Sequence, residues 1–265
     1  MIKKYLEMAI DIAQQAGAVL REEMHHPPTI AYKGDFDLVT QADRRSEQVI
    51  VRRLQQHFPG HTVAAEEGTG KNTGSEFVWH VDPLDGTTNF AHAYPCFCVS
   101  IALARRNELL LGVIYNPIYQ ELFAAARGQG VTFNGKKICC SKISSLKNSL
   151  LCTGFPNHNR EDNPNFHYYW DFTLRSHGVR RDGSAALDLA YVAMGRFDGF
   201  WEFGLNPWDV AAGIVLVEEA GGQITDMQGN PYALSGPSIL ASNGLIHDEM
   251  VRVAAEVSIQ TIPRK

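Results

Sequence analysis

The segment from Val81 to Phe90 sets two carboxylates three residues apart and follows them with a Gly-Thr-Thr turn. Carboxylate and carbonyl oxygens are the ligands that hard cations such as Mg²⁺ prefer. The backbone N–H groups of a Gly-Thr-Thr turn can hold an anion. A metal site and an anion site so close together predict chemistry on a phosphate group.

Asp82 is the acid in this segment that most needs a partner. It ends the apolar run 77–81, and a buried carboxylate without a counter-charge is strongly unfavourable. No lysine or arginine lies nearby in the sequence to pair with it. A divalent cation would neutralise Asp82 and Asp85 together, and Pro83 stiffens the turn so that the Leu84 carbonyl could be a third oxygen ligand.

Further acids stand at the ends of predicted strands or the starts of predicted helices. Glu66 and Glu67 follow a strand directly, and spacing alone does not separate them. Asp209 opens a helix, where an acid also stabilises the helix dipole without any catalytic function. Asp43 can likewise be a capping residue, and Glu202 can be an ordinary acid at a strand edge.

Hydrophobic periodicity predicts the elements that must bring these acids together. Helices are expected over 2–23, from near Thr40, and over 184–194, 208–220 and 246–256. Strands are expected over 62–65, 77–81, 96–104, 109–115, 121–126, 197–203 and 238–242, with 96–104 and 109–115 antiparallel and a turn at Asn134-Gly135. The order of elements predicts a layered α+β and α/β protein in two joined halves, about 1–147 and 148–265, forming a single catalytic unit over 1–265.

Composition narrows the class of protein further. The chain has 265 residues and a net charge of −5 without a basic block, so direct contact with nucleic acid is not expected. No apolar run reaches the roughly 18 residues of a membrane span. Glu7 and Asp11 interrupt the N-terminal pattern, which predicts a helix instead of a signal peptide and a cytoplasmic location.

The five cysteines form an odd set in close pairs, Cys96 with Cys98 and Cys139 with Cys140, plus Cys152. This pattern argues against a disulfide framework and lacks the spacing of a zinc site. Buried free thiols in strands are expected.

Several motifs, in order along the chain, resemble the inositol monophosphatase family of Mg²⁺-dependent, lithium-sensitive phosphatases. They are 38–43, 65–68, 82–90 and 208–213 with 219–222, while 181–189 and 199–202 resemble the bacterial branch. The resemblance runs from about residue 5 to residue 256. It implies the five-layered α-β-α-β-α sandwich of the inositol monophosphatase and fructose-1,6-bisphosphatase type, and a homodimer.

The resemblance also implies a metal site. Its ligands would be Glu66, Asp82, the Leu84 carbonyl, Asp85 and Asp209, holding two to three Mg²⁺ ions per active site. Mn²⁺ is an alternative ion, and Li⁺ or Ca²⁺ would inhibit. Lys33 matches a basic residue of the family near the first metal loop.

For catalysis, the resemblance implies that the Thr87 hydroxyl holds an attacking water, with Asp43 as its hydrogen-bond partner and Glu66 as a third catalytic residue. Gly86, Thr87 and Thr88 would hold the substrate phosphate. The substrate alcohol would contact Asp85, Gly183, Ser184, Ala185, Glu202 and Asp209.

The substrate expected from the resemblance is a small phosphorylated polyol, foremost myo-inositol 1-phosphate. Nucleotide bisphosphate and histidinol phosphate enzymes of the superfamily often carry a lysine where Thr88 stands. Fructose 1,6-bisphosphate, NADP and other small sugar phosphates remain alternatives. A function of a different class is binding to the transcription machinery with accessory phosphatase activity.

Overall fold

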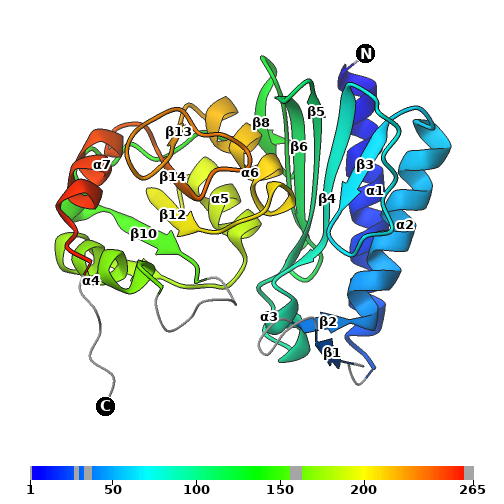
Figure 1. Ribbon diagram of the computed structural model, residues 1–265, viewed down its shortest axis with the longest axis horizontal. Helices are drawn as coiled ribbons and strands as arrows, with labels where there is room; N and C mark the ends of the chain where they lie inside the picture. The colour runs from blue at the N-terminus through cyan, green and yellow to red at the C-terminus, as the bar shows by residue number, and fades with distance from the viewer. Residues whose placement is uncertain (1, 27–29, 33–37, 156–162, 260–265) are drawn as a thin grey trace.

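Five layers alternate between helices and sheets in the computed structural model, which describes residues 2–26, 30–32, 38–155 and 163–259 (Figure 1). Helices α1 (Ile2–Glu23) and α2 (Gln41–His57) cover the outer face of a seven-stranded sheet. Helices α5 (Ala185–Ala193) and α6 (Pro207–Glu219) lie between that sheet and a five-stranded sheet. Helices α4 (Asn165–Arg175) and α7 (His247–Glu256) form the last layer. The predicted α-β-α-β-α sandwich is confirmed; Lys33 lies outside the described residues.

The seven-stranded sheet has the order β3-β4-β5-β6-β7-β8-β9. Its strands are β3 (Thr62–Ala65), β4 (Phe77–Asp85), β5 (Cys98–Arg105), β6 (Glu108–Asn116), β7 (Glu121–Ala126), β8 (Gly130–Phe133) and β9 (Lys136–Lys137). β3 is parallel to β4 and every other pairing is antiparallel, including the predicted pair β5 and β6. Asn134 and Gly135 both have positive φ between β8 and β9, which confirms the predicted turn.

β4 continues to Asp85, four residues beyond its predicted end at Val81. Pro83 is the reason for the difference, because a proline usually argues against a strand interior. Here the register against β5 shifts between Asp82 and Asp85, and such irregularities are where strands accept proline. The two acids therefore belong to the end of a buried strand.

The five-stranded sheet has the order β11-β10-β12-β14-β13. Its strands are β10 (Leu150–Thr153), β11 (Gly178–Arg180), β12 (Gly199–Phe203), β13 (Gln223–Thr225) and β14 (Ser238–Ser242). β10 runs parallel to β11 and β12, while β14 is antiparallel to β12 and β13. The strands predicted over 197–203 and 238–242 are present, whereas β10, β11, β13 and helix α4 were not predicted.

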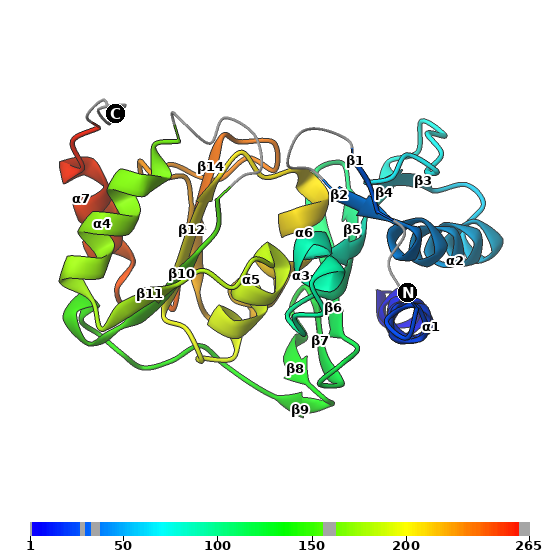
Figure 2. The ribbon, with the colours of Figure 1, turned by 90° about the horizontal axis from the view of Figure 1, so that it is seen from below.

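Helix α6 is apolar around its circumference because it packs between the two sheets (Figure 2). Its residues 210–217 are all buried. Helices α1 and α2 are amphipathic instead, since each has one face in water. The short strands β1 (Ile30–Tyr32) and β2 (Leu38–Thr40) lead into α2, α3 (Thr87–Ala91) follows β4, and a 3₁₀ turn η1 (Leu146–Asn148) precedes β10.

The N-terminus of α2 shows the predicted capping box. The Thr40 hydroxyl accepts a hydrogen bond from the Ala42 N–H at 3.1 Å, and Asp43 Oδ2 accepts one from the Thr40 N–H at 2.8 Å. This cap fixes Asp43 at the first turn of α2.

All five cysteines are free thiols, but their predicted burial in strands is only partly correct. Cys98 and Cys152 are buried in β5 and β10, and Cys140 is buried outside a strand. Cys139 is exposed and Cys96 is half-buried, both in connecting segments where no neighbouring layer covers them fully. Within the described ranges, no helix is long and apolar enough to cross a bilayer.

Candidate active site

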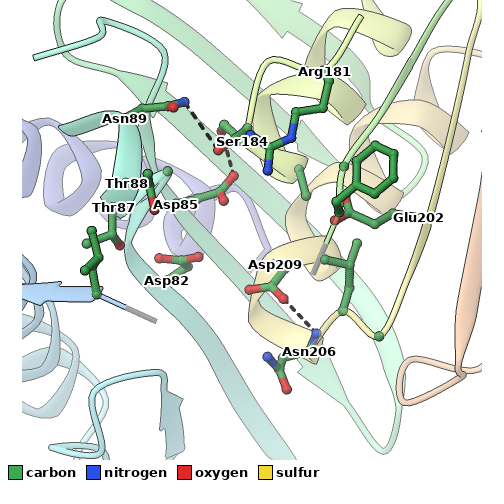
Figure 3. Close-up of a pocket in the computed structure, with 18 of the residues that line it drawn as sticks. Asp82, Asp85, Thr87, Thr88, Asn89, Arg181, Ser184, Glu202, Asn206 and Asp209 are labelled. Carbon is green, nitrogen blue, oxygen red and sulfur yellow. Dashed lines mark hydrogen bonds between the residues drawn. The ribbon is translucent and has the colours of Figure 1, made fainter. Parts of the chain in front are cut away.

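A cavity of about 770 Å³ opens between the end of β4, the start of α3, the segment before α5, strand β12 and the start of α6. It brings together twelve of the thirteen predicted site residues: Glu66, Asp82, Leu84, Asp85, Gly86, Thr87, Thr88, Gly183, Ser184, Ala185, Glu202 and Asp209. Figure 3 labels Asp82, Asp85, Thr87, Thr88, Ser184, Glu202 and Asp209 among them. Asp43 is the exception. It lies fully buried behind Thr87 and does not line the cavity.

Asp82 is the most enclosed acid of the cavity wall, with 2% of its surface exposed. Its Oδ1 accepts a hydrogen bond from the Leu84 N–H at 2.9 Å. Burial, and then the nearby charges of Glu66, Asp85 and Asp209, raise the pKa of Asp82 well above its ordinary value. The metal-free chain therefore disfavours the ionised form of this acid.

Asp85 is anchored by the helix that begins opposite it. Its Oδ2 accepts hydrogen bonds from the Ser184 hydroxyl and from the Ala186 N–H, both at 2.7 Å. Burial nevertheless raises the pKa of Asp85 to about 6, against the lowering effect of these donors. These donors anchor the carboxylate through Oδ2.

Asp209 occupies the first turn of α6, and its Oδ2 accepts a hydrogen bond from the Asn206 N–H at 2.7 Å. Burial and the charge of Asp85 raise the pKa of Asp209 to about 8. Asp209 therefore both caps α6 and belongs to the acidic cluster, because the hydrogen bond from the Asn206 N–H directs its side chain into the cavity (Figure 3).

The donor set fits a divalent cation. The charges of Glu66, Asp85 and Asp209 raise the pKa of Asp82, and that of Asp85 raises the pKa of Asp209; a cation between these acids would reverse this effect. Carboxylate and carbonyl oxygens without sulfur or imidazole suit Mg²⁺ or Mn²⁺ better than zinc. Within the described part of the chain, no group of three or more acids, histidines and cysteines is already arranged to hold a metal ion.

Thr87 and Asp43 form a hydrogen-bonded pair at the inner end of the cavity. The Thr87 hydroxyl lies 2.9 Å from Asp43 Oδ1 and 3.1 Å from the Leu84 carbonyl oxygen, and it can donate to either. Asp43 Oδ2 is already occupied by the N–H and hydroxyl of Thr40. Burial raises the pKa of Asp43, and the hydrogen bonds from Thr40 and Thr87 oppose that shift.

Gly86 makes the turn between β4 and α3 possible. Its φ of 97° lies in the left-handed region, and a Cβ there would stand 2.9 Å from the Cys96 carbonyl oxygen. The next residues begin a helix, whose first N–H groups have no intrahelical acceptor. These N–H groups are available to an anion in the cavity.

The opposite wall of the cavity carries the residues predicted to contact the alcohol. Gly183, Ser184 and Ala185 form the turn into α5, where the Ser184 side chain accepts a hydrogen bond from the Leu187 N–H at 3.4 Å. Glu202 stands on β12 with 6% of its surface exposed. Burial, then Asp209 and Asp85, raise the pKa of Glu202, while Arg181 lowers it.

Several residues of the cavity received no function from the sequence. Arg181 is the one lysine, arginine or histidine among the described lining residues. Asn89 joins α3 to the segment before α5, because its Nδ2 donates to the Cys96 carbonyl at 2.6 Å and to the Asp182 carbonyl at 2.8 Å. Arg181 lies in the motif 181–189 and Asn89 in the motif 82–90, so their place in these motifs could have indicated that they belong to the site.

An aromatic group forms a further part of the wall and carried no signal in the sequence. The rings of Phe155 and Phe166 are 4.9 Å apart, and Tyr169 is 5.9 Å from Phe155. Two of these residues belong to α4, which was not predicted.

Residues 1–260 match a family model whose description is "Inositol monophosphatase family". An inositol-1-monophosphatase from Synechocystis sp. is 45% identical, over 96% of this chain and 90% of that protein. A protein named Nus factor SuhB from Pseudomonas aeruginosa is 42% identical over 90% and 91% of the two chains. A fructose-1,6-bisphosphatase/inositol-1-monophosphatase from Aquifex aeolicus is 39% identical over 96% of each.

Solved structures show the same similarity in three dimensions. An inositol monophosphatase from Anabaena (Nostoc) sp. has a TM-score of 0.89 and 44% identity, with 97% of each chain covered. The extragenic suppressor protein suhB from Bartonella henselae has a TM-score of 0.91 and 39% identity, covering 96% of this chain and 99% of that one.

Proposed function

The chain belongs to the inositol monophosphatase family and is a phosphatase, and we propose that it releases phosphate from myo-inositol 1-phosphate with the aid of Mg²⁺. The observation that carries this proposal is the acidic cluster. Asp82, Asp85 and Asp209 line one cavity with raised pKa values, next to a threonine hydroxyl that is hydrogen-bonded to a buried acid.

Two or three Mg²⁺ ions would be held by Glu66, Asp82, the Leu84 carbonyl, Asp85 and Asp209, with Mn²⁺ as an alternative ion and Li⁺ or Ca²⁺ as inhibitors. Bound there, the ions would supply an activated water and neutralise the charge of the leaving oxygen. The carboxylates must be ionised to bind a cation, and the cation in turn favours their ionised form.

Thr87 and Asp43 position the proton of the attacking water. The Thr87 hydroxyl donates to Asp43 Oδ1, which leaves its oxygen lone pairs free to accept a hydrogen bond from a water in the cavity. A proton can then pass from the water to the hydroxyl while the hydroxyl proton moves toward Asp43. Glu66, which also lines the cavity, is the third residue of this catalytic group.

The N–H groups of Gly86, Thr87 and Thr88 hold the phosphate of the substrate, where fixed donors stabilise the charge of the transition state. The alcohol then extends toward Gly183, Ser184, Ala185 and Glu202. A carboxylate such as Glu202 can accept hydrogen bonds from two neighbouring hydroxyls, which suits a polyol. We also expect a homodimer in solution, which light scattering on the purified protein would test.

A side-by-side assay of phosphate esters tests the function. Phosphate release would be measured from inositol 1-phosphate, fructose 1,6-bisphosphate, NADP and p-nitrophenyl phosphate, each with Mg²⁺ and with EDTA. We expect release only with Mg²⁺ and the highest kcat/KM for inositol 1-phosphate. Equal release in EDTA would contradict the metal requirement.

Fructose 1,6-bisphosphate is the alternative substrate favoured by a specific observation, the name of the Aquifex aeolicus relative. It would use the same acids and the same threonine. A higher kcat/KM for this ester in the assay above would assign the chain to that substrate.

Binding to the transcription machinery is the alternative of a different class, favoured by the name of the Pseudomonas aeruginosa relative. It would use a surface outside the metal site. Binding to purified components of that machinery should therefore survive Asp82→Asn, whereas phosphate release should not.

A further inference from the structure

A buried polar network lies directly behind the alcohol end of the cavity, on the side of α4. Asn165 is fully buried, and its Oδ1 accepts a hydrogen bond from the Trp201 Nε1–H at 2.5 Å. Its Nδ2 donates to the Thr153 hydroxyl at 2.9 Å and to the Gly154 carbonyl at 2.6 Å. The amide oxygen and the amide nitrogen of Asn165 are therefore both hydrogen-bonded to residues at the ends of β10 and β12.

The direction of every hydrogen bond in this network is determined. The indole N–H of Trp201 can only donate, so it faces the amide oxygen of Asn165. The Thr153 hydroxyl donates to the Trp201 carbonyl at 2.6 Å and therefore accepts from Asn165. Thr153 and Trp201 are fully buried, and such a satisfied network holds one geometry firmly.

The network fixes the strand ends from which two cavity residues emerge. β10 and β12 are parallel neighbours, with Thr153 opposite Trp201. The next residues along the two strands are Gly154 and Glu202, and both line the cavity. Asn165 therefore sets the distance between Gly154 and Glu202 at the alcohol end.

Gly154 provides the space that the Glu202 carboxylate occupies. A Cβ built on Gly154 would overlap both oxygens of that carboxylate. The carboxylate therefore lies where a side chain at position 154 would project. A movement of the carboxylate toward Gly154 would therefore meet the strand end that Asn165 holds.

We propose that Asn165 is a positioning residue that, with Gly154, orients the Glu202 carboxylate and so determines the preference for esters of hydroxyl-rich alcohols. This inference rests on the proposed function, because it needs Glu202 to contact the alcohol. Asn165 acts through Glu202 and does not touch the reacting phosphate. Its loss should weaken recognition of the alcohol and leave attack on the phosphate intact.

The test compares two esters that differ in the alcohol. The first is the hydroxyl-bearing ester that the unmodified enzyme hydrolyses fastest among inositol 1-phosphate, glycerol 2-phosphate and fructose 1,6-bisphosphate. The second is p-nitrophenyl phosphate, whose leaving group has no further hydroxyl. The measured quantity is the ratio of their kcat/KM values, with Mg²⁺ present throughout.

In Asn165→Leu this ratio should fall about 10-fold or more, which corresponds to the loss of a hydrogen bond to a charged group. Glu202→Gln should lower the ratio similarly, and the double variant should lower it no further than Glu202→Gln alone. Asp171→Asn is the matched control on α4, where the half-buried Asp171 pairs with Arg175. Its ratio should stay within about twofold of the unmodified enzyme.

Gly154→Ala keeps the inference testable if Asn165→Leu fails to fold. It leaves the buried network intact and displaces the Glu202 carboxylate directly, so the ratio should fall as in Glu202→Gln. An unchanged ratio in folded Gly154→Ala or Asn165→Leu would overturn the inference. So would equal losses on both esters, or a double variant whose loss is the product of the two single losses. If the unmodified enzyme hydrolysed no ester at all, the proposed function would fail first and this inference with it.

Discussion

The carboxylates of Asp82, Asp85 and Asp209 are unfavourable where they stand unless a positive charge joins them. Burial raises the pKa of Asp85 to about 6, and burial together with the charge of Asp85 raises that of Asp209 to about 8. A core selected for stability alone would replace such acids with apolar side chains. Their presence around one cavity is therefore best explained by a bound cation.

Thr87 is the residue whose hydroxyl links the cavity to a buried acid, so its removal should affect the chemical step. We expect Thr87→Val to lower kcat about 100-fold with a small change in KM, because it removes the partner of the attacking water. Thr87→Ser should keep kcat within about tenfold, since the hydroxyl remains. Steady-state kinetics on inositol 1-phosphate would check both, and a kcat for Thr87→Val close to that of Thr87→Ser would contradict this assignment.

Asp209 should make the stability of the metal-free protein depend on pH. Its pKa is about 8 in the folded chain against an ordinary 3.8, so the folded state holds a proton that the unfolded state releases. The associated stability is complete below about pH 4 and is lost as the pH rises through about 8. In EDTA, the melting temperature of Asp209→Asn should therefore exceed that of the unmodified protein by a margin that grows from pH 6 to pH 9.

Added Mg²⁺ provides the control for this prediction. It should raise the melting temperature of the unmodified protein more at pH 8 than at pH 6, since the ligands must lose protons to bind it. A margin that stayed constant between pH 6 and pH 9 would show that Asp209 does not titrate as described.

At the scale of elements, long periodic segments were predictable and short ones were not. α1, α2 and the antiparallel pair β5 and β6 have clear apolar patterns, and the capping box at Thr40 marks the start of α2. Helix α4 was not predicted, and it carries Asn165, Phe166 and Tyr169 of the cavity region. The three-residue strands β11 and β13 are too short to show a period, and their pairing with β10 and β14 depends on the sheet.

The turn between β4 and α3 orients the residues of the site, and Gly86 is the critical residue of this turn. Gly86→Ala and Gly74→Ala should each cost about 1 kcal/mol in the free energy of unfolding, because both positions have positive φ. Gly86→Ala should cost a further 1–3 kcal/mol, roughly, because its Cβ meets the Cys96 carbonyl, whereas nothing lies within 4 Å of a Cβ at Gly74. Urea unfolding would measure the difference; equal losses would mean that the turn relaxes freely.

At the scale of the whole molecule, the site draws on both sheets. Asp82 and Asp85 come from the seven-stranded sheet, Glu202 from the five-stranded sheet and Asp209 from α6 between them (Figures 1 and 3). We propose that the halves divided near residue 147 work as a single catalytic unit over 1–265. That the carboxylates and Thr87 share one cavity could be predicted from ordered motifs, because metal ligation would restrict residue type. The function that we propose for Asn165 and Gly154 could not be predicted, because it depends on which strand ends meet.

One cooperative transition is expected when the protein is heated in a calorimeter, because α6 packs against both halves and Asn89 joins α3 to the segment before α5. Its calorimetric and van't Hoff enthalpies should agree. Two separate transitions would show that the halves fold independently, and the proposal of a single unit would then be wrong.

The most direct test of the central claim is phosphate release from inositol 1-phosphate by the unmodified protein and by Asp82→Asn, each over a range of Mg²⁺ concentrations. Asp248→Asn, which changes an exposed acid in the first turn of α7, is the control. The account predicts Mg²⁺-dependent release by the unmodified protein and by Asp248→Asn, and a rate reduced at least about 100-fold in Asp82→Asn at every Mg²⁺ concentration. An Asp82→Asn protein that released phosphate at the unmodified rate would contradict it.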